Sequence, residues 1–260
     1  MSNDPITSLQ NDKVKLARNL QQKARTRRKE RKIVLEGTRL VRDAIQRKLK
    51  AHYIFYQIDE ADPALITFIE QKNIALIPAD HQVIQHMSET QHPQGIVGVF
   101  QLPMPPMPRK AKRVLILDRL RDPGNMGTLL RTAAAAGVEV VILSPECTDP
   151  YNPKVLRSGM GAHFRVPIVE ATWEEIAGYC ERLDVYLADG NGELTHNTVD
   201  WTRHWALVIG SEAHGISDET EMLNATQIRI PMAAHTESLN AGVAAGIILF
   251  EAARQNNFKV

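Results

Sequence analysis

The chain has 260 residues, of which 43% are hydrophobic, so it can bury the core of one large domain or two moderate ones, and bulk disorder is excluded. Its longest apolar stretch, residues 241–250, is far shorter than the roughly 18 residues of a membrane span, and no export signal is visible. Cys147 and Cys180 form no CxxC pair, which disfavours disulfides and a structural zinc and favours a reducing cytoplasm.

The net charge of +1 hides a strong asymmetry between two parts of the chain. Residues 13–50 hold 15 Lys or Arg and 3 acids, a net charge of +12, and the rest of the chain carries −11. Lys and Arg that face phosphates gain affinity by releasing counterions, so this segment is expected to meet a polyanion. A solvated helical face is the alternative interpretation.

The first hundred residues alternate between helical and strand patterns. Apolar residues recur at helical spacing through residues 8–28, and Gly37 opens a second helical segment. Strands are expected at residues 33–35, 52–56, 74–77 and 96–100, and further helices at 64–72 and 81–87. This alternation predicts a small α/β domain.

A proline-rich stretch, LPMPPMP at residues 102–108, follows this domain. Prolines cannot donate ladder hydrogen bonds and favour an extended, stiff connection. We therefore expect a first domain at residues 1–102, a linker at 103–109 and a second domain at 110–260.

The second domain has the pattern of a buried parallel sheet. Apolar runs mark strands at residues 114–117, 138–143, 185–188 and 207–209, with helix-length segments between several of them. Two helices rich in small residues are expected at 127–136 and 239–254. The domain is therefore predicted to be α/β with a parallel sheet.

Polar residues follow the first of these strands. Within residues 117–138, Asp118 ends the strand, Asn125 lies near the start of the next helix, and Arg131 follows six residues later. That spacing separates Asn125 and Arg131 by about 240° around a helix, so they need not touch. A turn or capping residue and a surface charge are the alternative interpretations, although Arg131 stands among leucines and alanines.

Two further strands are followed by polar residues and glycines, in residues 207–217 and 228–254. The residues concerned are Gly210, Ser211, Glu212, Ser238 and Asn240. Glycines let backbone amides approach a ligand, whereas Ser238 or Asn240 could simply cap the last helix. Open α/β sheets assemble their sites at strand ends of this kind, so the three places together predict a binding site.

Several familiar chemistries lack their motifs. The sequence has no GxGxxG, no GxxxxGK[ST], no HExxH and no GxSxG. His235 and Glu237 match half of the zinc deaminase signature, but no PCxxC follows them. Neither a metal nor a dinucleotide cofactor is therefore expected.

At these residues the sequence resembles the SpoU, or TrmH, branch of the SPOUT RNA methyltransferases. The three signature motifs of the branch match residues 122–137, 209–215 and 230–246. Residues 8–100, including Glu36 and Gly37, resemble the substrate-binding domain that many members carry in front. The likeness is greatest to ribosomal RNA methyltransferases of the thiostrepton-resistance type.

The resemblance implies methyl transfer from S-adenosylmethionine to a ribose 2′-hydroxyl of RNA. It also implies a trefoil knot near the C-terminus and a homodimer that draws catalytic residues from both subunits. The family's functional residues fall on Asn125, Arg131, Glu212, Ser238 and Asn240. Its cofactor positions correspond to Gly190, Ile209, Gly210, Ser211, Ile230, Met232 and Leu239. The pattern departs from the family at residues 213–214 and 241–242, which bears on cofactor geometry rather than on the reaction.

The expected mechanism is an in-line displacement in which the 2′-oxygen attacks the activated methyl group. Arg131 is assigned as the base by the resemblance, but arginine is normally fixed in its charged form, so orientation and charge stabilisation are the equal alternative. RNA binding is expected at the basic N-terminal run and one later arginine, namely Arg25, Arg27, Arg28, Lys29, Arg31, Lys32 and Arg157. A transfer RNA methylase and a catalytically silent RNA-binding protein of the same fold are the rival interpretations.

Overall fold

The computed structural model describes residues 4–211, 215–233 and 238–258. The chain forms two compact units, each built on its own β-sheet. The first unit comprises Met1–Pro103 and Tyr151–Arg157, and the second comprises Met104–Pro150 and Ser158–Val260. Within the described ranges, no helix is long and apolar enough to cross a membrane.

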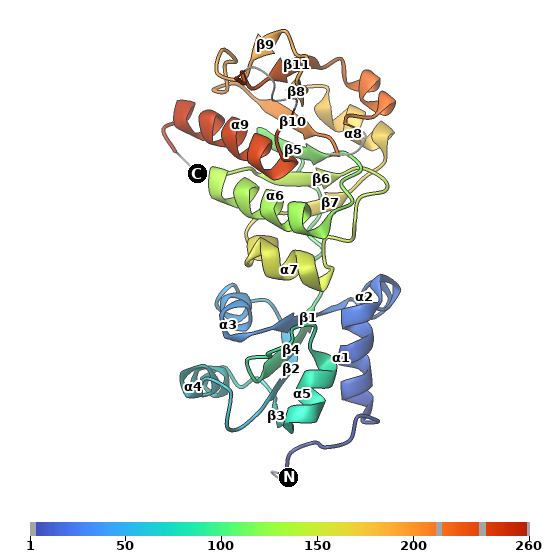
Figure 1. Ribbon diagram of the computed structural model, residues 1–260, viewed down its shortest axis with the longest axis vertical. Coiled ribbons are helices and arrows are strands. Elements are labelled where there is room, and N and C mark those ends of the chain that lie inside the picture. The colour runs from blue at the N-terminus through green and yellow to red at the C-terminus, as the bar shows by residue number, and fades with distance from the viewer. Residues whose placement is uncertain (1–3, 212–214, 234–237, 259–260) are drawn as a thin grey trace. The chain divides into compact units, whose positions relative to one another are not determined.

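The first unit is a four-stranded mixed sheet covered by helices on both faces. Its strand order is β1 (Lys32–Glu36), β4 (Ile96–Gln101), β2 (Ala51–Tyr56), β3 (Leu76–Pro78), and only the β2–β3 pair is parallel. In Figure 1, α1 (Asp12–Gln22) and α5 (His81–Met87) lie on one face, and α3 (Thr38–Gln46) and α4 (Pro63–Gln71) lie on the other. Apolar side chains of α1 and α5 pack on the strands to form the core.

The helical pattern of residues 8–28 forms two helices rather than one. Lys23 adopts an extended conformation, with φ −124° and ψ 112°, and separates α1 from α2 (Ala24–Glu30). Arg27 then lies against α1 and donates hydrogen bonds to the carbonyls of Leu20, at 2.5 Å, and Gln21, at 3.1 Å. These bonds satisfy carbonyls at the end of α1 that have no partner within the helix.

The second unit contains a seven-stranded sheet in which every pairing is parallel. The strand order is β7 (Ile168–Glu170), β6 (Val140–Leu143), β5 (Arg113–Leu117), β10 (Trp205–Ile209), β8 (Asp184–Ala188), β11 (Thr226–Arg229), β9 (Leu194–Thr195). All residues of β6 and β10 are buried, as expected for strands covered on both faces. The predicted parallel α/β domain is confirmed.

Helices cover both faces of this sheet. Two long helices, α6 (Pro123–Ala136) and α9 (Ala241–Gln255), lie side by side on one face (Figure 1). They approach closely because Gly242 has no side chain: a Cβ there would lie 3.1 Å from Cγ2 of Thr128. In the described part of this unit, the other helices are α8 (Trp173–Cys180) and two 3₁₀ helices at Ala162–Phe164 and Asp218–Leu223. Most of α7 (Pro153–Gly159) belongs to the segment Tyr151–Arg157 of the first unit.

Candidate active site

A pocket of about 340 Å³ opens at the carboxyl ends of β8, β10 and β11, beside the start of α9. Because these strands are parallel, their carboxyl ends meet at one edge of the sheet, where α/β folds bind ligands. The lining residues are Ala188, Asp189, Gly190, Ile209, Gly210, Ser211, Gly215, Ile216, Ile228, Ile230, Met232, Ser238, Leu239, Asn240, Ala241 and Ala244.

The residues predicted to hold the cofactor come together here. All seven of them line this pocket, as do two of the predicted catalytic residues, Ser238 and Asn240. Their roles in binding and catalysis stay predictions. The sequence interpretation missed Asp189, although it directly follows β8 and precedes Gly190, which the family resemblance had identified.

The loop after β10 forms one wall of the pocket. Ser211 and Gly215 exchange two backbone hydrogen bonds, of 3.0 and 2.9 Å, which close the loop on itself. A Cβ on Gly210 would lie 2.3 Å from the carbonyl oxygen of Gly215, so the closed loop requires glycine at position 210. Glu212, the catalytic residue predicted in this loop, lies outside the described residues.

The composition of the pocket fits S-adenosylmethionine. Isoleucine, leucine and methionine side chains offer apolar surface, and the glycine loops expose backbone donors and acceptors. Among the described lining residues, Asp189 is the one ionisable side chain. Its Oδ1 accepts a hydrogen bond of 2.7 Å from the amide of Asn191, which holds a carboxylate beside a pocket expected to take a cationic ligand.

The side-chain amides of two predicted catalytic residues that are distant in the sequence meet at the start of α9. Asn240 is the N-cap of this helix, and its Oδ1 accepts hydrogen bonds from the amides of Gly242, at 3.0 Å, and Val243, at 3.3 Å. Its Nδ2 is thereby turned outward and donates to Oδ1 of Asn125, at 3.0 Å. Asn125 is itself held at the start of α6, because its backbone amide donates to Oδ1 of the N-cap residue Asp122 at 2.8 Å.

Arg131 is not brought into this cluster. It lies on an exposed position of α6 and is not one of the described residues that line the pocket. The structure therefore joins Asn125 to the pocket through Asn240 and leaves the predicted catalytic arginine on the surface of the same unit.

The predicted RNA-binding residues differ in exposure. Four of them, Arg25, Arg28, Lys29 and Arg31, are exposed on and just after α2. Lys32 is half-buried and forms an ion pair of 3.9 Å with Glu30, and Arg157 is half-buried on α7. Arg27 is only 3% exposed and is engaged with the carbonyls that end α1, so its guanidinium supports the fold of this unit.

The chain matches two known sequence families. The SpoU rRNA methylase family matches residues 112–250, and the MRM3-like substrate binding domain matches residues 11–98. The first match covers the whole pocket described above, and the second covers most of the first unit.

Individual relatives agree with these matches. Mitochondrial rRNA methyltransferase 3 of Mus musculus is 34% identical over 90% of this chain and 70% of its own length. The 23S rRNA (guanosine(2553)-2′-O)-methyltransferase RlmP of Bacillus subtilis is 31% identical over 94% of this chain and 97% of its own. A crystal structure of an AdoMet-bound rRNA methyltransferase from Sinorhizobium meliloti matches with a TM-score of 0.84 and 31% identity, over 96% of this chain and 97% of that one.

These matches, together with a pocket of suitable size and lining, confirm the expected RNA methyltransferase and its cofactor, S-adenosylmethionine. The chain belongs to the SpoU rRNA methylase family.

Proposed function

We propose that this chain transfers the methyl group of S-adenosylmethionine to a ribose 2′-hydroxyl of ribosomal RNA. The observation that carries the proposal is the hydrogen bond between the side chains of Asn240, which lines the pocket where the methyl donor fits, and Asn125. The names of the relatives support ribosomal RNA over transfer RNA, and the Bacillus subtilis relative is named for 2′-O-methylation of a guanosine in 23S rRNA.

The proposed mechanism relies on alignment. Bound S-adenosylmethionine supplies an electrophilic methyl group on a sulfonium. Asn125 and Asn240 orient the ribose so that its 2′-oxygen faces this group, and holding two reactants in line accounts for a large part of such an acceleration. Ser238, which lines the pocket, hydrogen-bonds close to the ribose in this proposal. Glu212 orients the loop after β10 and the substrate.

Arg131 acts on the 2′-hydroxyl in this proposal, in one of two ways. It takes the proton with the help of a substrate phosphate, or it stays charged while it orients the ribose and stabilises the developing oxyanion. The two roles differ in the pH dependence of turnover, because only a base must lose its proton before each cycle.

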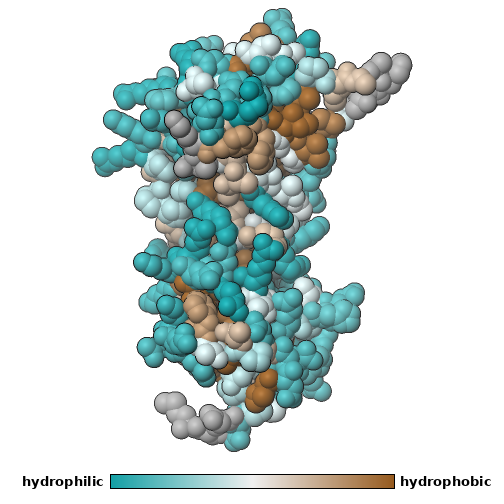
Figure 2. All heavy atoms as spheres, turned by 90° about the vertical axis from the view of Figure 1, so that its left-hand side faces the viewer, coloured by the Kyte–Doolittle hydropathy of each residue, from teal (hydrophilic) through white to brown (hydrophobic). Residues whose placement is uncertain are grey.

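We also propose a homodimer in which Arg131 serves the pocket of the partner subunit. Arg131 is exposed and does not line the described wall of its own pocket. A stripe of exposed apolar side chains on α9, formed by Val243, Ile247 and Phe250, offers a surface for the second copy. Figure 2 shows hydrophobic atoms gathered on the side of the second unit that carries α9.

The first unit is proposed to bind the RNA through the basic cluster, which we define as Arg25, Arg28, Lys29, Arg31 and Lys32. These side chains come from one short stretch of chain, and at least four of them are exposed. Side chains of this kind recognise the phosphates and the shape of the RNA.

We further propose domains at residues 1–102 and 110–260 joined by a linker at 103–109, a trefoil knot in the second domain and a cytoplasmic location.

The test is methylation of separated RNAs by the purified protein with labelled S-adenosylmethionine, followed by mapping of alkali-resistant linkages. We expect label at a 2′-position of ribosomal RNA, and none with the Arg131→Ala variant, which should still bind the donor. Label on transfer RNA alone would show that transfer RNA, and not ribosomal RNA, is the substrate. Donor binding without transfer to any RNA, including assembled ribosomal particles, would favour the catalytically silent alternative.

A further inference from the structure

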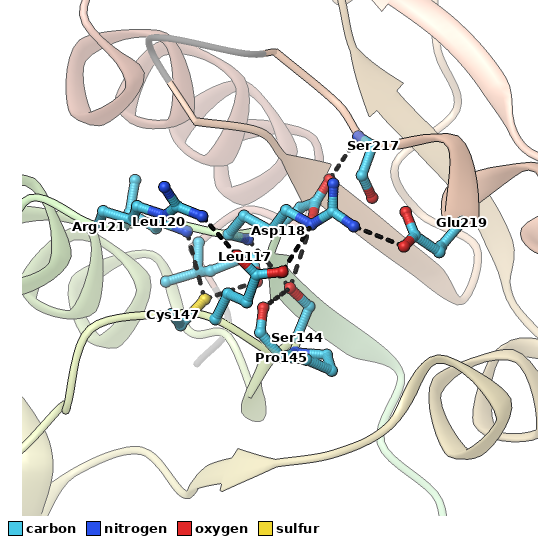
Figure 3. A network of polar contacts seen from close by, with 11 residues as sticks. Leu117, Asp118, Leu120, Arg121, Ser144, Pro145, Cys147, Ser217 and Glu219 are labelled. Atoms are coloured by element: carbon cyan, nitrogen blue, oxygen red, sulfur yellow. Dashed lines mark hydrogen bonds and ion pairs between the residues drawn. The ribbon is translucent and has the colours of Figure 1, made fainter.

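Asp118 places a fully buried carboxylate at the end of β5, next to the pocket loop but outside the pocket lining. Its Oδ2 accepts a hydrogen bond of 2.7 Å from the amide of Ser217, and its Oδ1 accepts one of 3.3 Å from the hydroxyl of Ser144 (Figure 3). A buried carboxylate is costly unless it is hydrogen-bonded, so these contacts fix the positions of both partners.

Ser217 is the point at which the pocket loop returns to the body of the domain. Gly215 and Ile216, just before it, line the pocket, and Gly215 is bonded to Ser211 across the loop. The bond from the Ser217 amide to Asp118 therefore holds the returning arm of this loop against the end of β5.

The other side of Asp118 leads to the catalytic amides. The four residues after Asp118 reach Asp122, the N-cap of the helix that carries Asn125. The amide of Arg119 donates to Oγ of Ser144 at 3.0 Å, and the Arg119 guanidinium pairs with Glu219 of the 3₁₀ helix at 2.5 Å. One carboxylate thus lies between the pocket loop and the loop that leads to Asn125.

The thiol of Cys147 holds the same stretch of backbone. Its Sγ donates to the carbonyl of Leu117, at 3.2 Å, and accepts from the amide of Leu120, at 3.3 Å (Figure 3). Burial raises the pKa of this thiol, which keeps the proton needed for donation. The backbone on both sides of Asp118 is therefore held in place without help from its carboxylate. Removal of that carboxylate is expected to move the pocket loop that hydrogen-bonds to it, and not the end of β5.

We propose that Asp118 is a positioning residue for methyl transfer, which fixes the returning arm of the pocket loop, residues 215–217, and so holds this wall of the cofactor pocket in place. It acts through the Ser217 amide and touches neither substrate nor cofactor. The inference depends on the proposed reaction only for its effect on turnover, because its effect on donor binding is measurable without RNA.

The test compares four variants by titration calorimetry with S-adenosylmethionine. Asp118→Ala removes the acceptor of the Ser217 amide and should weaken donor binding by about tenfold, the loss expected when a buried donor is left without its hydrogen bond. Ser217→Pro removes the amide hydrogen from the other side, at a φ of −83° that proline tolerates, and should give a similar loss.

Two variants are matched controls. In Asp118→Asn the amide oxygen can accept from Ser217 and the amide nitrogen can donate to Oγ of Ser144, whose own hydrogen then goes to the carbonyl of Pro145, 3.1 Å away. This variant should therefore retain donor affinity. Ser144→Ala removes the other partner of Asp118 and leaves the bond to the loop, so it should also bind the donor as the wild type does.

A merely structural role would lower the thermal midpoint and leave the affinity of the folded protein unchanged. Wild-type affinity in Asp118→Ala, or in Ser217→Pro should the alanine variant not fold, would overturn the proposal. An equal loss in Ser144→Ala would overturn it as well. If the wild type transfers no methyl group to RNA while these affinities differ as expected, the proposed reaction fails, and the role of Asp118 in holding the donor pocket stands.

Discussion

Replacing Asn240 by serine separates the two tasks of this side chain. Its Oδ1 caps α9 and its Nδ2 binds Asn125. Serine caps helices about as well as asparagine but is too short to reach Asn125, whereas alanine can neither cap the helix nor bind Asn125. Loss of the cap costs about 1 kcal/mol, and loss of the hydrogen bond between the two amides costs about 1 kcal/mol more.

We therefore expect the free energy of unfolding to fall by about 1 kcal/mol in Asn240→Ser and by about 2 kcal/mol in Asn240→Ala. If the bond to Asn125 positions the ribose as proposed, turnover should fall by about tenfold in both variants, which corresponds to about 1.4 kcal/mol of lost transition-state stabilisation, because both variants lose this bond. The measurements are urea unfolding and single-turnover methyl transfer at saturating S-adenosylmethionine.

A double-mutant cycle with Asn125→Ala tests the coupling directly. If the two amides act as a unit, the second substitution should add little to the loss of turnover caused by the first. Wild-type turnover in Asn240→Ser, or losses that add fully in the double variant, would refute a catalytic role for this pair.

Coexpressed Arg131→Ala and Asn240→Ala chains should regain about one quarter of wild-type activity, since half of randomly paired dimers would hold one intact site of two; no recovery would place Arg131 and Asn240 in the same subunit's site. Removing the charges of Arg25, Arg28, Lys29 and Arg31 should weaken RNA binding. If each of them contacts a phosphate, the slope of the logarithm of the binding constant against the logarithm of the salt concentration should fall by about 3 in magnitude. An unchanged slope would exclude phosphate contacts by these four residues. Burial lowers the pKa of His163 from 6.5 to about 4, against a smaller opposing effect of its hydrogen bond to the Pro150 carbonyl, so the folded state binds fewer protons than the unfolded chain between these values. Stability should therefore fall by about 3 kcal/mol as the pH drops from 6.5 to 4, and His163→Gln should show a smaller loss in urea unfolding at pH 7 and pH 4.5.

The positions of the pocket residues could be predicted from the family resemblance together with the pattern of polar residues and glycines after strands. Gly190, Gly210 and Ile230 each lie within two residues of the end of a strand of the parallel sheet, and the carboxyl ends of parallel strands meet at one edge. Two strands of the same sheet, β7 and β9, were missed because they have only 3 and 2 residues, too few for a periodic pattern.

The basic run shows where charge density misleads. In the sequence Arg27 is one of several similar basic residues, and only the break at Lys23 turns it back onto the carbonyls of Leu20 and Gln21. Helical periodicity predicts a continuous helix through this point, because neither glycine nor proline marks the break. Tertiary structure therefore decides which arginine is used inside the fold and which ones stay available for phosphates.

Contacts between distant segments could not be obtained from spacing along the chain. Asn125 and Asn240 are 115 residues apart, and Asp118 and Ser217 are 99 residues apart, yet each pair is joined by one hydrogen bond. In each pair, one member lies at the end of β5 or the start of α6, and the other lies at the start of the 3₁₀ helix Asp218–Leu223 or of α9. The sheet brings these ends together, so residues that look like separate caps and turns in the sequence lie beside one pocket, whereas Arg131 is a predicted catalytic residue that the same fold leaves exposed and outside the described pocket lining.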